Sequence, residues 1–136
     1  MIINLHFNEF RKNRCVPETL FVMLERDVAY EMSVNHIHIE LKSNQISKDN
    51  ELWCLSTNLI DRSTSNPLQA VSYFTLARGK LNYNVTHGPV ASYPLDVHQL
   101  ENTEFLFRRV TKEKILNIQQ AFVQIEIKRC LESARV

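Results

Sequence analysis

The stretch that decides the fold prediction is KEKILNIQQAFVQIEIKRCLESAR, residues 112–135, which contains neither glycine nor proline. Plotted as a helix at about 100° per residue, it gathers several polar residues on one narrow side: Asn117, Gln120, Gln124 and Lys128. Apolar residues occupy most of the remaining circumference. The sequence therefore predicts a C-terminal helix over 111–135, with Thr111 as its N-cap.

The apolar surface of this predicted helix is wide. A helix that lies on a single core needs an apolar stripe of only about 100°. A wider surface indicates that the helix either sits deep in the protein or packs against two partners. In a chain this short, the second partner is expected to be another copy. We therefore expect Leu116, Val123 and Ile127 to lie near a subunit interface.

Bulk composition indicates one globular domain, residues 1–136. The chain is 44% hydrophobic and 23% charged, and it carries a net charge of only +1, so any anion-binding surface must be a local cluster. The three cysteines, Cys15, Cys54 and Cys130, are too widely spaced to predict a disulfide framework or a zinc site. We expect them to be reduced. The start of the chain does not read as a signal peptide, and no run is long enough to span a membrane.

Glycine is scarce, with only Gly79 and Gly88 in the whole chain. Phosphate-binding loops and dinucleotide-binding turns need several clustered glycines, which excludes those classes of nucleotide-binding enzyme. The sequence contains no G-x-S-x-G motif and no recognisable pair of catalytic carboxylates. We therefore predict a protein that is not an enzyme and that needs no cofactor.

Short segments of β-forming residues occupy much of the chain. Five segments are predicted to be strands: 2–7, 20–26, 34–42, 52–60 and 104–110. Residues 67–85 are ambiguous, because they fit either a helix that begins after Asn66-Pro67 or a hairpin that turns at Gly79. The aromatic and β-branched residues favour the hairpin. Together these features predict an α+β fold in which antiparallel, sandwich-like sheets pack against the C-terminal helix.

His36-x-His38-x-Glu40 is the one motif with metal-ligand chemistry. Alternation along a strand would place all three side chains on one face, about 7 Å apart. A zinc site usually needs a further ligand, and no partner motif is present in the sequence. The favoured interpretation is the solvated face of an amphipathic strand, so no metal site is predicted.

Basic residues form local groups near predicted turns. We predict that two groups bind RNA phosphates or anionic lipid headgroups: Arg108, Arg109, Lys112 and Lys114 in the first, and Arg11, Lys12 and Arg14 in the second. The alternative is that these charges simply mark solvated loops. The first group is favoured because positive charge at a helix start is unfavourable without an external anion.

The order of segments resembles a known family. A Val16-Pro17 pair precedes a hydrophobic strand, and the strand EFLFRRV at 104–110 runs through TKEK into ILNIQQAFVQIEIKR. This arrangement resembles the small matrix proteins of bornaviruses and their relatives among negative-strand RNA viruses. The correspondence is carried by Leu106, Arg108, Lys112 and Glu113 together with the pattern that follows them.

The resemblance implies a viral structural protein that forms homo-oligomers, with a tetramer expected. Such proteins bind the inner face of an anionic membrane and also bind RNA or the viral nucleoprotein complex. Their location is the virion interior beneath the envelope, and the host cytoplasm, membrane inner face or nucleus during assembly. The alternative function is a dimeric adaptor or chaperone that binds neither RNA nor lipid.

Overall fold

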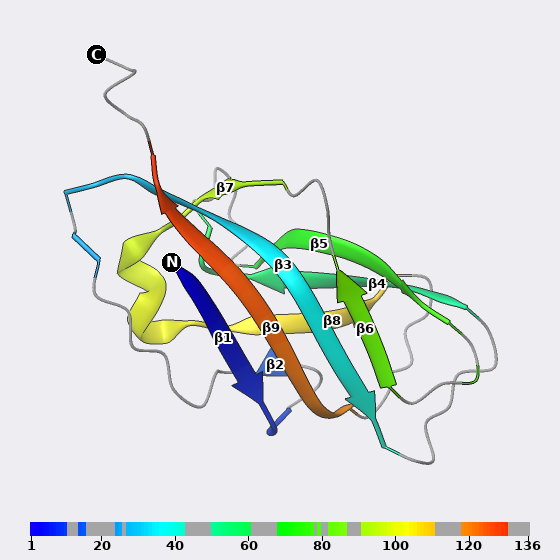
Figure 1. Cartoon of the computed structure of the whole chain (residues 1–136). Coiled ribbons are helices and arrows are strands. Elements are labelled where there is room, and N and C mark those ends of the chain that lie inside the picture. Colours follow the sequence, from blue (N-terminus) through cyan, green and yellow to red (C-terminus); the bar gives the residue numbers. More distant parts are fainter. Residues whose placement is uncertain are drawn as a thin grey trace.

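The structure is a computed structural model that describes residues 1–10, 14–15, 24–25, 27–42, 50–60, 68–77, 79, 82–86, 91–110 and 118–130. Its elements are β1 (Ile2–Phe7), β2 (Arg14–Cys15), β3 (Tyr30–Leu41), β4 (Glu51–Thr57), β5 (Gln69–Leu76), β6 (Asn82–Thr86), β7 (Tyr93–Pro94), η1 (Val97–Asn102), β8 (Phe105–Arg109) and β9 (Ile118–Arg129). The strands form two antiparallel sheets (Figure 1).

Sheet A has the strand order β1-β9-β3-β6, and the short β7 also pairs with β3. Its two central strands, β3 and β9, are each 12 residues long and pair along nearly their whole length. Sheet B has the order β2-β8-β4-β5. Figure 1 shows the two sheets stacked, with the strands of sheet B crossing behind those of sheet A. The described chain is therefore a β-sandwich.

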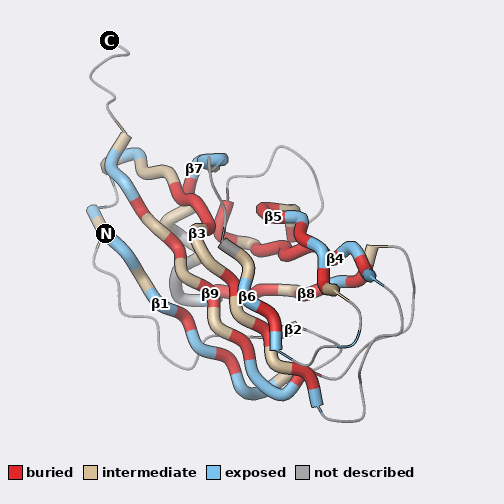
Figure 2. The backbone as a smooth tube through the Cα atoms, turned by 45° about the vertical axis from the view of Figure 1, so that its right-hand side comes forward, coloured by how far each residue is buried: buried red, intermediate tan, exposed pale blue. Residues whose placement is uncertain are grey.

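The core lies between the two sheets, where buried residues of both sheets gather (Figure 2). Trp53 of sheet B and Ile37 of sheet A are both completely buried in this core. Phe7 of β1 reaches across the interior to sheet B, where its ring centroid lies 5.5 Å from that of Phe105. Burying such side chains supplies most of the driving force for bringing two sheets together.

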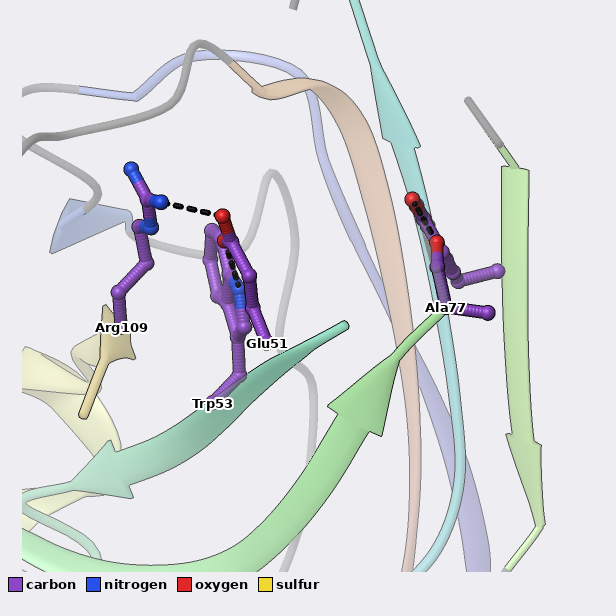
Figure 3. Close-up of polar contacts among 5 residues, drawn as sticks. Glu51, Trp53, Ala77 and Arg109 are labelled. Atoms are coloured by element: carbon purple, nitrogen blue, oxygen red, sulfur yellow. Dashed lines mark hydrogen bonds and ion pairs between the residues drawn. The ribbon is translucent and has the colours of Figure 1, made fainter. Parts of the chain in front are cut away.

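Polar contacts also join the sheets at their margins. The Tyr83 hydroxyl in β6 donates a 2.8 Å hydrogen bond to the carbonyl of Ala77, just after β5 (Figure 3). Leu95 donates its N–H to the Tyr30 carbonyl of sheet A, and Asp96 donates to the Leu59 carbonyl beyond β4. These bonds fix the two sheets relative to one another.

The predicted C-terminal helix is wrong. Residues 118–129 form strand β9, and the described residues contain no α-helix. Ala121, Val123, Ile125 and Ile127 are buried, and each is followed by a more exposed residue. A period of two residues gives a strand with one apolar face. Plotted at helical spacing, the same period spreads apolar residues around the wheel, which explains the width of the apparent apolar surface.

The strand predictions for 2–7, 34–42, 52–60 and 104–110 are confirmed by β1, β3, β4 and β8. The predicted strand at 20–26 falls mostly outside the described residues. Residues 69–76 and 82–86 are strands, which excludes the helical alternative, but the hairpin pairing is also wrong. β5 belongs to sheet B and β6 to sheet A, so the chain changes sheets between them. Gly79, at φ 77°, supports this crossing because its backbone conformation favours glycine.

No helix among the described residues has the length and apolar character needed to cross a membrane.

Candidate functional site

The strongest predicted basic group is divided by strand β8. Arg108 is exposed on the outer face of sheet B, whereas Arg109 is 8% exposed and faces the interior. Consecutive residues of a strand point to opposite faces, so these two arginines cannot act on one ligand. The prediction that Arg109 binds RNA or lipid is therefore corrected, because its guanidinium is used inside the protein.

Arg109 forms a buried ion pair with Glu51 at the end of the sandwich where β4 begins (Figure 3). The other carboxylate oxygen of Glu51 accepts a 3.3 Å hydrogen bond from the Trp53 indole N–H. The register places Arg109 directly opposite Trp53 on the neighbouring strand. This buried cluster satisfies a charge that would otherwise be costly to desolvate, so its role is to organise the core.

The two predicted basic groups meet along the β2–β8 pair. The backbone of Arg14 in β2 lies opposite Leu106, two residues from Arg108. The other predicted members of these groups, Arg11, Lys12, Lys112 and Lys114, lie outside the described residues. The structure therefore brings one residue of each group to the same edge of sheet B.

Two exposed apolar side chains accompany Arg108 on the outer face of sheet B. Cys54 lies between Tyr73 of β5 and Arg108 of β8 in the strand register, and Leu52 is on the same face. Tyr73 is 58% exposed and Leu52 is 37% exposed. We call Leu52, Tyr73 and Arg108 the outer patch of sheet B. Sequence analysis missed Leu52 and Tyr73, although the alternation within each strand places them away from the core.

The buried thiol of Cys54 lies at the centre of the outer patch, 3.6 Å from the Ser56 hydroxyl. Cys54 itself is completely buried, whereas Tyr73 and Arg108, its partners on the two neighbouring strands, are exposed. The guanidinium of Arg108 can pair with an anionic group, while the apolar atoms of Tyr73 and Leu52 enter a less polar environment beside it.

The outer face of sheet A carries His36, His38 and Glu40, as the alternation predicted. His38 Nδ1 lies 2.9 Å from Asn84 Oδ1, and Glu40 accepts a hydrogen bond from the Gln120 side chain. These contacts to amides fit a solvated, hydrogen-bonded strand face. Within the described part of the chain, no three His, Cys, Asp or Glu side chains are grouped to hold a metal ion.

A shallow depression of about 450 Å³ opens on this face of sheet A. Its lining comes from β1, β3, β6 and β9: His6, His36, His38, Asn84, Gln120, Ala121 and Phe122. The Phe122 ring lies 4.9 Å from the His6 ring and 6.2 Å from the His36 ring. We call this depression the histidine hollow. None of the described residues that line it is Lys or Arg, so this part of the lining suits a largely uncharged group better than a phosphate.

His6 and Phe122 were not identified from the sequence as site residues. The alternation in β1 does place His6 on the other face of the strand from the buried Leu5 and Phe7, so the sequence could have predicted that His6 is exposed. Phe122 could not be placed, because a helical reading of 111–135 puts it on a different surface from that of strand β9.

Glu126, on the outer face of β9, has a pKa held below its usual value. The main cause is a 3.2 Å hydrogen bond from the Asn35 amide to one carboxylate oxygen. Lys128, whose Nζ is 3.2 Å from the other oxygen, adds a smaller lowering. Both contacts favour the charged carboxylate.

Two of the three residues predicted to lie at a subunit interface are in the core of the chain. Val123 and Ile127 are 0% and 3% exposed and belong to the core of the chain itself. Leu116 lies outside the described residues. The side chains of Val123 and Ile127 are therefore not available to a second copy.

Comparisons with protein families, curated proteins and solved structures return no significant match.

Proposed function

We propose that this chain is a non-enzymatic, matrix-type structural protein that self-assembles and binds an anionic membrane surface. The observation that carries the proposal is the outer patch of sheet B, which combines the exposed Arg108 with the exposed Tyr73 and Leu52. The resemblance to bornavirus matrix proteins supports the proposal only in part, because it includes a terminal helix and this segment of the chain contains strand β9. In this proposal the protein works beneath a viral envelope and in the infected cell.

The chemistry of the patch fits a headgroup region better than a nucleic acid. A basic side chain near an anionic bilayer contributes about 1 kcal/mol, and tyrosine favours the boundary between water and lipid. One arginine with two apolar neighbours gives weak binding for a single copy. Many copies on one surface multiply that affinity through effective concentration. Self-assembly is therefore part of the proposed mechanism, with a tetramer or larger particle expected.

The test measures co-sedimentation with vesicles of phosphatidylcholine that contain about a third phosphatidylserine, in low salt. We expect Arg108→Glu to reduce binding several-fold, because it replaces attraction to the headgroups by repulsion. Arg129→Glu is the matched control, since Arg129 is an exposed arginine of sheet A and its replacement changes the net charge equally. Equal losses in the two variants would show that net charge, and not the patch, determines binding.

The apolar contribution of Tyr73 to vesicle binding can be separated from the charge of Arg108 by its salt dependence. Tyr73→Ser should weaken vesicle binding at high as well as low salt, whereas the effect of Arg108→Glu should shrink as salt screens the charge. Short single-stranded RNA serves as the other anionic ligand. If RNA binding depended on Arg108 while vesicle binding did not, the membrane assignment would be wrong and the RNA phosphates would be the ligand.

A second candidate function is an interaction module that binds an uncharged partner, which the histidine hollow favours. Its ring and amide side chains offer stacking and hydrogen bonds without a fixed positive charge. This function requires no anion, so it predicts that vesicle binding is absent at every salt concentration. Loss of partner binding in Phe122→Ala, with Arg108→Glu unaffected, would support it.

A further inference from the structure

Strand β1 forms one edge of sheet A, with its backbone paired to β9 on one side. Met1 and Ile127 exchange two backbone hydrogen bonds, from the Ile127 N–H to the Met1 carbonyl at 2.8 Å and from the Met1 amine to the Ile127 carbonyl at 2.9 Å. Hydrogen-bonded pairs alternate along an antiparallel ladder. The N–H and C=O groups of Ile2, Asn4 and His6 therefore point away from β9.

These three outward residues form an open edge among the residues that the structure describes. Between described residues, no backbone hydrogen bond outside the ladders uses the N–H or C=O of Ile2, Asn4 or His6. Edge strands are commonly blocked by proline, by charged side chains or by a bulge. The strand reads IINLHF, contains none of those residues, and pairs with β9 in unbroken register. Ile2 is also 60% exposed.

We propose that β1 pairs antiparallel with β1 of a second copy of this chain. A two-fold axis at Asn4 would place Asn4 opposite its own copy and Ile2 opposite His6 of the second copy. By symmetry, His6 of the first copy then lies opposite Ile2 of the second, which gives three pairs. Because the outward groups recur at every second residue, each of the three pairs exchanges two hydrogen bonds. This inference rests on the self-assembly in the proposed function and names the strand that provides it.

The same two-fold pairing extends sheet A across both copies. Directly opposed residues lie on the same face of a sheet, so Ile2 of one copy would cover the His6 ring of the other on the outer face. His6 lines the histidine hollow, and the two hollows would therefore adjoin across the interface. A symmetric contact of this kind is the commonest closed assembly.

The contact involves one six-residue strand from each copy, which is small for a permanent interface. We expect a dimer that forms as the protein concentration rises, and that larger particles build upon. Light scattering over a concentration series measures this directly.

Asn4→Pro is the decisive variant because proline lacks the N–H that points outward at this position. It leaves the β1–β9 ladder intact, since the inward bonds belong to Ile3, Leu5 and Phe7. Asn4→Thr is the matched control. Both variants lose the 3.1 Å hydrogen bond from the Gln124 amide to the Asn4 side chain, but threonine keeps the outward N–H.

We expect Asn4→Pro to remain monomeric at concentrations where Asn4→Thr and the natural chain form dimers. The His6 ring signals in NMR should shift with concentration in Asn4→Thr and stay constant in Asn4→Pro. If Asn4→Pro fails to fold, Ile2→Lys tests the same contact, because it places a lysine on the edge strand opposite His6 of the second copy, and an edge lysine disfavours strand pairing. Ile2 is exposed, so this variant alters no buried residue. Equal masses for the folded blocking variant and the natural chain would overturn the proposal.

Failure of this inference is distinguishable from failure of the proposed membrane function. Self-association is measured without vesicles, and Arg108→Glu should leave it unchanged because sheet B is not involved. A dimer that persists in Asn4→Pro but binds vesicles through Arg108 would refute the role of β1 and leave the membrane proposal standing.

Discussion

Two ion pairs in this sandwich join the same kinds of charge in opposite environments. In sheet B, the side chains of Arg109 and Glu51 are 6% and 3% exposed. In sheet A, the side chains of Lys128 and Glu126 are 63% and 26% exposed. The first pair closes one end of the core, and the second lies on a solvated strand face. The contrast shows that the contribution of each pair to stability depends on what happens to the remaining charge when its partner is removed.

The environments explain the difference. Removing one charge from the buried pair leaves the other in a medium where water cannot replace the lost contact. Removing one charge from the exposed pair leaves a group that water solvates again, and salt already screens the attraction. The same difference separates Arg109 from its neighbour Arg108, whose charge faces the solvent and is available to a ligand.

The largest effect is expected for Arg109→Ala. It leaves the Glu51 carboxylate buried without the guanidinium and opens a void beside Trp53. Breaking a buried pair in this way costs about 3–5 kcal/mol of unfolding free energy, which urea denaturation would measure. Arg108→Ala is the control on the same strand and should change stability little. Similar losses in both variants would mean that Arg109 is not buried with Glu51.

A smaller effect is expected when both members of the buried pair are made apolar. Arg109→Met combined with Glu51→Leu removes both charges and keeps most of the volume, so no charge is left buried. Such replacements are often neutral or stabilising, and the double variant should be clearly more stable than Arg109→Ala. A double variant as unstable as Arg109→Ala would indicate that other polar contacts of the two side chains stabilise this end of the sandwich.

The two 12-residue strands of sheet A show how much of this fold could be predicted. In β3, histidines and a glutamate alternate with Ile37, Ile39 and Leu41, and the sequence alone identifies a strand. In β9 the alternation is equally regular from Ala121 to Lys128. Phe122 on its outer face and the apolar residues that precede Ile118 obscure the period, and glutamine, glutamate and lysine are good helix formers.

The pairing of β9 could not have been read from local sequence. It lies between β1 and β3, which are more than 75 residues away in the chain, and those strands satisfy its backbone hydrogen bonds on both sides. Local propensity was overridden by these distant contacts. The antiparallel sheets were predicted correctly, because short strands such as β1 and β8 carry their own alternation.

The candidate site shows a similar division. The sequence identified Arg108 and the shared face of His36, His38 and Glu40. It grouped Arg109 with Arg108 because proximity in sequence was read as proximity in space, and the alternation of a strand separates them. The outer patch and the histidine hollow each draw residues from three or four strands, so register determined them and sequence spacing did not.

The smallest predicted effect concerns the exposed pair and depends on pH. The pKa of Glu126 is lowered from 4.5, first by the Asn35 amide and then by Lys128. A lowered carboxylate pKa contributes stability that is fully present above the unfolded value and is lost as pH falls through the folded pKa. We expect Asn35→Ala to raise the pKa of Glu126 toward its usual value, measured by NMR titration of its carboxyl group.

Lys128→Ala tests the order of the two causes. It should raise the pKa of Glu126 less than Asn35→Ala does, and high salt should remove part of the Lys128 effect while leaving the amide hydrogen bond. The contribution of these contacts to the unfolding free energy should disappear as the pH falls through the lowered folded-state pKa of Glu126, because the carboxyl group is then protonated in both the folded and the unfolded chain. If Lys128→Ala raised the pKa of Glu126 more than Asn35→Ala did, the charge of Lys128 would be the main cause of the lowered pKa. That result would contradict the contrast drawn between the exposed pair and the buried pair of Arg109 and Glu51.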